Sequence, residues 1–91
     1  SFVDCDPDTA NAEVERVPEA AWSRAGAAVV THLYGSPVDV EAWIERARAH
    51  GMFVVEDCAQ ALGARLRGRR VGTFGDAATF SFALTKNFTT L

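Results

Sequence analysis

Two residues of this 91-residue chain are of types that could carry covalent chemistry, and each follows a predicted buried strand. Lys86 is the only lysine, and it follows an apolar, aromatic and β-branched run at residues 77–82. Asp57 follows a similar run at residues 52–56. Open α/β sheets bind their ligands at this edge, and a partly desolvated amine can form a Schiff base with an aldehyde cofactor. Taken alone, Lys86 also fits an exposed loop lysine, and Asp57 fits a turn or a helix cap.

The elements that would position these two residues form a strand, a helix and a second strand. Residues 27–33 alternate little in polarity, which is typical of a parallel strand covered on both faces. A helix of about 13 residues is expected next, with Ser36 as its cap and Pro37 in its first turn. Gly51 ends this helix, and residues 52–56 form the second strand. The helix buries one apolar stripe, which consists of Val40, Trp43, Ile44 and Ala47. The pattern predicts an α/β fold with a mostly parallel sheet and a right-handed βαβ crossover.

Three smaller elements complete the prediction. The run Phe2–Cys5 is a short strand candidate. Pro18 and the acidic residue after it indicate the start of a short helix. Residues 64–66 and 69–71 are predicted to pair as a small hairpin around Arg67 and Gly68.

Composition excludes several classes of function. A net charge of −3 argues against general binding to a polyanion, so the four arginines of the predicted hairpin are expected to form a solvated face. Apolar runs are too short to cross a bilayer, and the N-terminus lacks the pattern of a signal peptide. Cys5 and Cys58 lack the spacing of a zinc site or a disulfide framework, which fits a reducing cytoplasm. The glycines form neither a dinucleotide fingerprint nor a phosphate-binding loop.

Five short segments resemble one known family in their order and spacing. They are Phe2–Thr9, His32–Gly35, Glu56–Ala61, Arg69–Gly72 and Ser81–Asn87. The specific part is the pair Glu56-Asp57-x-Ala-Gln60 and Ser81-Phe-x-x-x-Lys86-Asn87. By these motifs the chain resembles the DegT/StrS type of pyridoxal 5′-phosphate (PLP)-dependent sugar aminotransferase over essentially its whole length.

The resemblance implies a role for each matched residue. Lys86 would form the internal aldimine with PLP and later move a proton between substrate and cofactor. Asp57 would keep the pyridine nitrogen protonated, which PLP needs to act as an electron sink. Gln60 would lie against the ring and its 3-hydroxyl group, and Ser81 would bind the phosphate. His32 and Asn87 are possible pocket residues, although a buried structural role for His32 fits as well. No residue is expected to bind a metal.

The resemblance also implies what surrounds these residues. Residues 1–91 would be part of the cofactor-binding large domain of a fold-type-I enzyme, with an upstream segment and a C-terminal small domain outside them. The implied substrates are an amino donor, glutamate, and a keto-sugar nucleotide, and the implied assembly is a cytoplasmic homodimer. Residues 1–91 alone are expected to be inactive. Two alternatives are a non-catalytic gene fragment and a sugar dehydratase-type relative, in which a histidine replaces the lysine.

Overall fold

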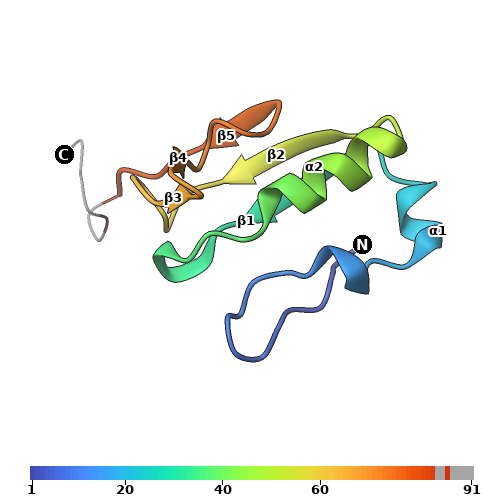
Figure 1. Cartoon of the computed structure of the whole chain (residues 1–91), viewed down its shortest axis with the longest axis horizontal. Helices are drawn as coiled ribbons and strands as arrows, with labels where there is room; N and C mark the ends of the chain where they lie inside the picture. The colour runs from blue at the N-terminus through green and yellow to red at the C-terminus, as the bar shows by residue number, and fades with distance from the viewer. Residues whose placement is uncertain (84–85, 87–91) are drawn as a thin grey trace.

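A parallel sheet of three strands, β1 (Ala27–Thr31), β2 (Phe53–Asp57) and β5 (Ala77–Thr79), organises the chain (Figure 1). The computed structural model describes residues 1–83 and 86. The strands lie in the order β1-β2-β5, and both neighbouring pairs are parallel. The predicted α/β fold is therefore confirmed.

Helix α2 (Val40–Ala49) connects β1 to β2 and packs on one face of the sheet. Its predicted stripe is confirmed, with Val40, Trp43 and Ala47 buried and Ile44 partly buried against the same core. Trp22 packs against Trp43 with ring centroids 5.8 Å apart. The helix thereby provides most of the apolar contact that holds the βαβ unit together.

The two ends of α2 differ in how well the sequence predicted them. At the C-terminal end, Gly51 has φ +67°, and the N–H groups of Gly51 and Met52 donate to the carbonyls of Arg48 and Ala47. This is the predicted glycine-terminated end, in the form of a Schellman motif. At the N-terminal end the predicted cap was wrong, because Asp39 and not Ser36 accepts a hydrogen bond from the first turn. The helix consequently begins later than predicted and has 10 residues.

The N-terminal part of the chain holds less regular structure than predicted. The expected strand at Phe2–Cys5 was wrong, because within the described residues this segment makes only one isolated antiparallel bridge, between Cys5 and Ala12. The side chain of Asn11 is buried and holds this segment in place by binding the backbone of Leu33 and Ser36. A 3₁₀ turn (Val14–Arg16) and the short helix α1 (Glu19–Trp22) follow, and α1 confirms the helix predicted at Pro18.

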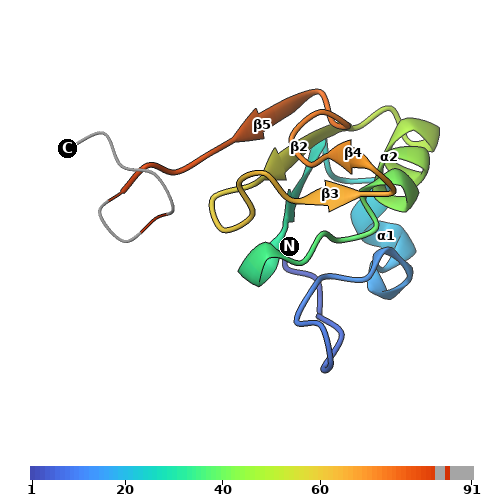
Figure 2. The same ribbon diagram turned by 60° about the vertical axis from the view of Figure 1, so that its left-hand side comes forward.

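A hairpin of β3 (Arg65–Leu66) and β4 (Arg69–Arg70) lies between β2 and β5 in the sequence, and it forms as predicted (Figure 2). Arg67 and Gly68 have φ of +48° and +80°. Both central residues are thus left-handed, which the two-residue type I′ turn requires. The hairpin lies beside the main sheet, and the segment after it leads into β5.

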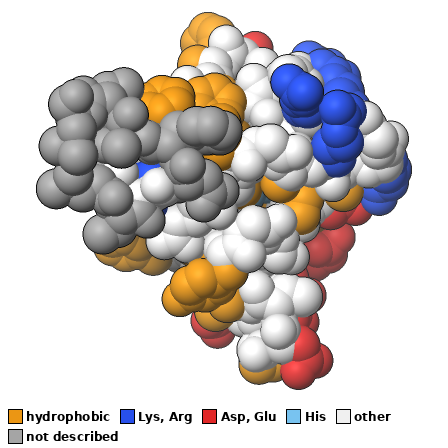
Figure 3. Space-filling model, turned by 90° about the vertical axis from the view of Figure 1, so that its left-hand side faces the viewer, with side chains coloured by type: hydrophobic (Ala, Val, Ile, Leu, Met, Phe, Trp, Pro, Cys, Tyr) orange, Lys and Arg blue, Asp and Glu red, His pale blue; other side chains and the backbone are white. Residues whose placement is uncertain are grey.

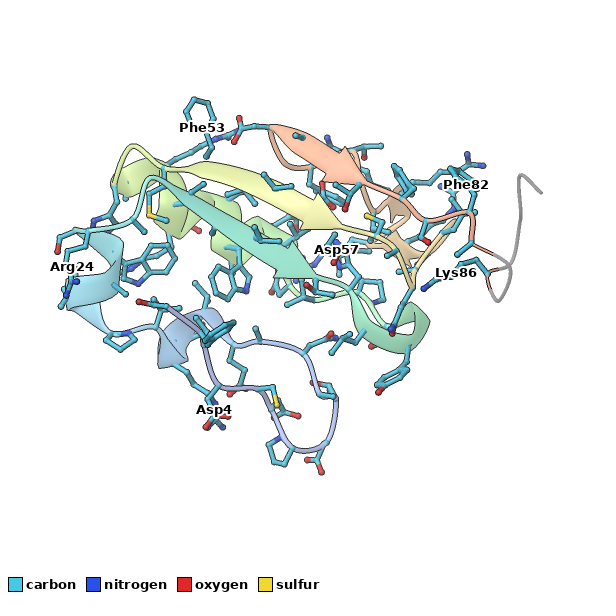
Figure 4. All side chains as sticks on the ribbon, turned by 180° about the vertical axis from the view of Figure 1, so that it is seen from behind. Asp4, Arg24, Phe53, Asp57, Phe82 and Lys86 are labelled. Atoms are coloured by element: carbon cyan, nitrogen blue, oxygen red, sulfur yellow. The ribbon has the colours of Figure 1, made fainter. Side chains whose placement is uncertain are left out.

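The face of the sheet opposite α2 is open in the described part of the chain. Val29 and Phe53 lie on it with 68% and 65% of their surface exposed. The prediction that both faces of β1 are covered therefore does not hold within these residues. Figure 4 looks onto this open face and shows the three strands pointing toward the same end of the molecule. None of the helices in the described residues is long and apolar enough to span a membrane.

Candidate active site at the strand ends

Asp57 is the last residue of β2, and its carboxylate lies on the open face of the sheet. The side chain is half-buried. Its Oδ1 accepts hydrogen bonds from the backbone N–H of Ala59 at 3.0 Å and from Oγ1 of Thr79 at 3.3 Å. Within residues 1–83 and 86, Oδ2 has no hydrogen-bond partner. Two neighbours therefore fix the orientation of the carboxylate and leave one oxygen for a ligand.

Gln60 lies in the turn after β2, and its side chain connects this turn to the segment that follows β1. Its Oε1 accepts a hydrogen bond from the backbone N–H of Tyr34 at 3.2 Å. Tyr34 has φ +51°, a left-handed conformation that is uncommon for a residue with a side chain. The hydrogen bond fixes one end of the Gln60 amide and leaves the amide nitrogen as a donor at the edge of the sheet.

Ser81 and Lys86 follow β5, and both are half-buried. The backbone N–H of Lys86 donates to the carbonyl of Ala83 at 2.9 Å. Figure 4 shows Asp57 at the arrowhead end of β2 and Lys86 farther out at the same end of the molecule. Asn87, the other residue predicted in this segment, lies outside the described residues.

His32 directly follows β1, and its ring is buried, with 0% of its surface exposed. Nδ1 accepts a hydrogen bond from the backbone N–H of Val38 at 3.1 Å, so the ring proton is on Nε2. Nε2 then donates to Oε2 of Glu56 at 3.1 Å. Both ring nitrogens are bound within the protein, and this geometry gives His32 a structural role. A pocket role for His32 stays a prediction.

Glu56 is the residue that the sequence motif contained but to which no role was assigned. Its side chain is fully buried. Besides His32, it accepts hydrogen bonds from the backbone N–H groups of Gly72 at 2.6 Å, Phe74 at 2.7 Å and Gly75 at 2.7 Å. Burial by itself raises the pKa of the carboxyl group, but the three N–H groups and His32 outweigh it and hold the pKa below its usual value. One available signal was an acidic residue at an inward position of an otherwise apolar strand.

The group of His32, Glu56 and Cys58 resembles a metal site in spacing but not in available electron pairs. One ligand atom from each lies within 4.8 Å of the others. However, both nitrogens of His32 and both carboxylate oxygens of Glu56 are already bound. Burial, together with the charges of Glu56 and Asp57, raises the pKa of the Cys58 thiol to about 11. A protonated thiol is a poor metal ligand, so we assign these residues to the structure of the fold.

The arginines of the hairpin are largely engaged within the molecule. Arg67 pairs with Asp39 and Glu41 near the start of α2. Arg69 stacks on Phe74 with its guanidinium carbon 4.3 Å from the ring centroid. Figure 3 looks onto the side where the strands end, and it shows basic side chains gathered at one corner with acidic ones nearby. These contacts are those of a solvated face, not of a surface that tracks phosphates.

Two of the hollows that the described residues form lie beside the N-terminal segment, away from the strand ends. One of about 510 Å³ is lined by residues of the N-terminal segment and α2, including Val17, Trp22 and Arg46. The candidate chemistry therefore remains at the edge of the sheet that holds Asp57, Gln60 and Lys86.

Sequence comparison with known proteins identifies the family of the chain. The model of the DegT/DnrJ/EryC1/StrS aminotransferase family matches residues 1–91. The chain belongs to this family.

The proteins that this chain is similar to carry the names of different enzymes. The chain is 43% identical over 89 residues to a GDP-perosamine synthase of Escherichia coli O157:H7, which covers 98% of the chain and 24% of that protein. It is 46% identical over 87 residues to an L-glutamine:2-deoxy-scyllo-inosose aminotransferase of Micromonospora echinospora, covering 96% of the chain and 21% of that protein. A solved GDP-4-keto-6-deoxymannose-3-dehydratase with bound GDP-perosamine is 27% identical, with a TM-score of 0.86 over 97% of the chain and 23% of that structure. The chain thus spans about a quarter of the length of the proteins it matches.

Proposed function

We propose that the candidate-site residues at the strand ends form the cofactor-binding edge of a PLP-dependent aminotransferase that acts on a keto-sugar. The observation that carries the proposal is the placement of Asp57 and Lys86 at one end of a parallel sheet in a member of this family. Open α/β sheets bind ligands at this end. An amine and a carboxylate together are the two side chains that PLP chemistry requires from the protein.

The residues at this edge fit PLP in their chemistry. Asp57 has one carboxylate oxygen without a partner in residues 1–83 and 86, as a pyridinium N–H requires. Among the described residues the amide nitrogen of Gln60 has no acceptor, and Ser81 has a hydroxyl that could donate to a phosphate. Lys86 is half-buried after β5, and its amine is the group that could form a Schiff base with the aldehyde of PLP.

Each residue then has a defined task. PLP, when bound, withdraws electrons from the substrate carbon next to the amino group. Lys86 holds the cofactor through its Nζ atom, and after release it moves a proton to or from that carbon. Asp57, oriented by Thr79 and Ala59, keeps the ring nitrogen protonated. Gln60 supports one side of the ring while it ties the ends of β1 and β2 together.

The substrates and assembly follow from the resemblance and from the names of the relatives. We propose a keto-sugar nucleotide as acceptor, glutamate as amino donor, and a homodimer in the cytoplasm. The cyclitol aminotransferase among the relatives makes glutamine and a free keto-cyclitol the comparison that a substrate screen must include.

Trapping the bound cofactor tests the role of Lys86. PLP is added to the complete gene product, the adduct is reduced with borohydride, and the labelled peptide is identified by mass spectrometry. The label is expected on Lys86 alone, and a Lys86→Arg variant should lose it. Label at another amine, or none, would contradict the proposed function.

Replacing Asp57 tests the second task. The Asp57→Asn variant should still be labelled at Lys86 but should turn over about a hundredfold more slowly, if the lost charge supplied about 3 kcal/mol to the transition state. Thr79→Val should cause a smaller loss, because it removes only one of the two hydrogen bonds that orient the carboxylate. Unchanged turnover of Asp57→Asn would refute its role.

The dehydratase reading and the inactive-fragment reading have distinct outcomes. The dehydratase type has a histidine in place of the lysine, so Lys86 favours transamination. A product that contains a new amino group supports our proposal, and a deoxygenated sugar without one supports the dehydratase. Residues 1–91 expressed alone are expected not to transaminate, because relatives are about four times as long. Stoichiometric PLP binding with turnover by residues 1–91 would contradict this expectation.

A further inference from the structure

The carboxylate of Glu56 is bound by two separate parts of the chain. On the side of β1 it accepts a hydrogen bond from Nε2 of His32. On the side of β5 it accepts hydrogen bonds from three backbone N–H groups of the loop that leads into that strand, at Gly72, Phe74 and Gly75. We call these five residues the Glu56 network. Charge-assisted hydrogen bonds to a buried carboxylate are among the strongest in proteins, so the network fixes these parts relative to one another.

The loop is shaped so that its backbone reaches the carboxylate. Gly72 has φ +86°, and a Cβ atom there would lie 2.5 Å from Cζ of Phe80. A Cβ atom on Gly75 would lie 2.7 Å from the carbonyl oxygen of Val54. Only glycine permits this approach at both positions. Successive backbone N–H groups that converge on one anion form a nest, and here the anion is a side chain of the same chain.

The network lies directly behind the candidate site. Because side chains alternate along a strand, Glu56 points to the covered face of β2 while Asp57 points to the open face. The loop that Glu56 binds continues into β5 and then to Ser81 and Lys86. A second tie acts nearby, where the backbone N–H of Val54 donates to Oδ2 of Asp76 at 2.8 Å. The residues of the candidate site on β2 and after β5 are therefore connected through the side chain next to Asp57.

We propose that Glu56 is a positioning residue that sets the place of β5, and with it Lys86, relative to Asp57. This inference rests on the proposed function for its cofactor readout but not for its structural one. Glu56 has no contact with the substrate or the cofactor in this role. Its effect on them passes through the N–H groups of the loop.

Amide hydrogen exchange tests the structural part in the complete gene product. Glu56→Gln keeps the size of the side chain but replaces one acceptor oxygen with a donor that faces backbone N–H groups. Exchange across residues 72–80 should become at least about tenfold faster, since the loss of charged hydrogen bonds at these amides is of that order. Val54→Ala is the matched control, because Val54 lies two residues earlier on the same buried face of β2. When the two variants are compared under conditions of equal thermal stability, Val54→Ala should not selectively accelerate exchange in residues 72–80.

PLP affinity tests the positional part. Glu56→Gln should bind PLP at least about tenfold more weakly than Val54→Ala does, when both variants are compared under conditions of equal thermal stability. Glu56→Asp, which keeps the charge but is one methylene shorter, should restore part of the affinity. Equal affinities in Glu56→Gln and the control, or unchanged exchange at residues 72–75, would overturn the proposal. If the wild-type protein does not bind PLP, the proposed function fails, and the exchange experiment alone decides whether Glu56 positions β5.

Discussion

The βαβ unit and the segment after it are stabilised in different ways. Between Ala27 and Asp57, helix α2 buries an apolar stripe against the sheet, and the strands pair along five positions. Between Gly72 and Thr79, the chain pairs with β2 along only three positions, and hydrogen bonds of the Glu56 and Asp76 carboxylates hold it there. Apolar packing thus builds the scaffold, and a charged network places the strand that leads to Lys86. The two regions should respond differently to mutation and to pH.

The largest effect is expected from breaking the apolar side of this comparison. Trp43→Ala should lower the free energy of unfolding by about 3–5 kcal/mol, because it removes a buried ring and leaves a cavity beside Trp22. Chemical denaturation of the complete gene product measures the change. Glu45→Ala, an exposed position on the same helix, should stay within about 0.5 kcal/mol of wild type. Comparable losses in both variants would mean that the stripe does not hold the unit together.

A smaller effect is expected from a methyl group on the polar side. Gly72→Ala should destabilise the protein by about 1–3 kcal/mol more than Gly68→Ala does. Both glycines have a left-handed backbone, but only Gly72 has side-chain atoms where a Cβ atom would lie. The difference between the two variants therefore isolates the close contact with Phe80 from the backbone strain. Denaturation measures it, and equal losses would show that the loop can move away from Phe80 without cost.

Acidification should separate the two regions. The pKa of Glu56 is lowered in the folded state, so its contribution to stability is present at neutral pH and is lost as the pH falls through that lowered value. Cys58 packs against Gly72, so its reaction with 4,4′-dithiodipyridine reports on the Glu56 network, and tryptophan fluorescence reports on the βαβ unit.

Cys58 should become reactive at a higher pH than that at which the fluorescence changes. Asp39 also has a lowered pKa, chiefly through its hydrogen bond with Arg67, but its protonation only weakens the exposed start of α2. Glu56→Gln should expose Cys58 already at neutral pH. Loss of both signals at one pH would mean that the two regions unfold as a unit.

The smallest effect concerns the two thiols and leaves stability unchanged. Cys5 is exposed, whereas Cys58 is buried and its pKa is raised to about 11. Iodoacetamide at neutral pH should therefore modify Cys5 and spare Cys58, because the thiolate is the reactive form. Peptide mapping after brief labelling measures the ratio. Equal modification of both thiols would show that the region around Gly72 opens under native conditions.

The sequence predicted the βαβ unit well because periodicity and turn chemistry are local signals. The stripe of α2, its glycine end and the hairpin turn at Arg67 and Gly68 all depend on residues close in sequence. The two errors at element starts have different causes. Asp39 competed with Ser36 as a cap, and the segment Phe2–Cys5 had the composition of a strand but only a single bridge to Ala12.

The candidate site was predicted only in part, since its supports are distant in sequence. The positions of Asp57 and Lys86 followed from strand ends and from the family motif. The bond from Gln60 to the backbone of Tyr34 and those from Glu56 to the loop join residues 16 to 26 positions apart. Their partners are backbone N–H groups, which every residue except proline has. The residue types in the sequence therefore do not indicate where these hydrogen bonds form. The tasks assigned to Asp57, Gln60, Ser81 and Lys86 stay predictions.

The order of the two acidic residues at the end of β2 has a consequence for which sequences this family segment can accept. Exchange of Glu and Asp is among the mildest changes on a protein surface, but here Glu56→Asp is expected to keep only part of the effect of Glu56. The longer side chain, that of Glu56, accepts hydrogen bonds from the loop before β5, and the shorter one, that of Asp57, lies on the open face of the sheet. Reversing the pair would conserve composition and charge yet shorten the inward reach by one methylene. A single inserted residue in β2 would turn each carboxylate to the opposite face. Drift at these positions is therefore constrained by order and by spacing, and not by charge alone.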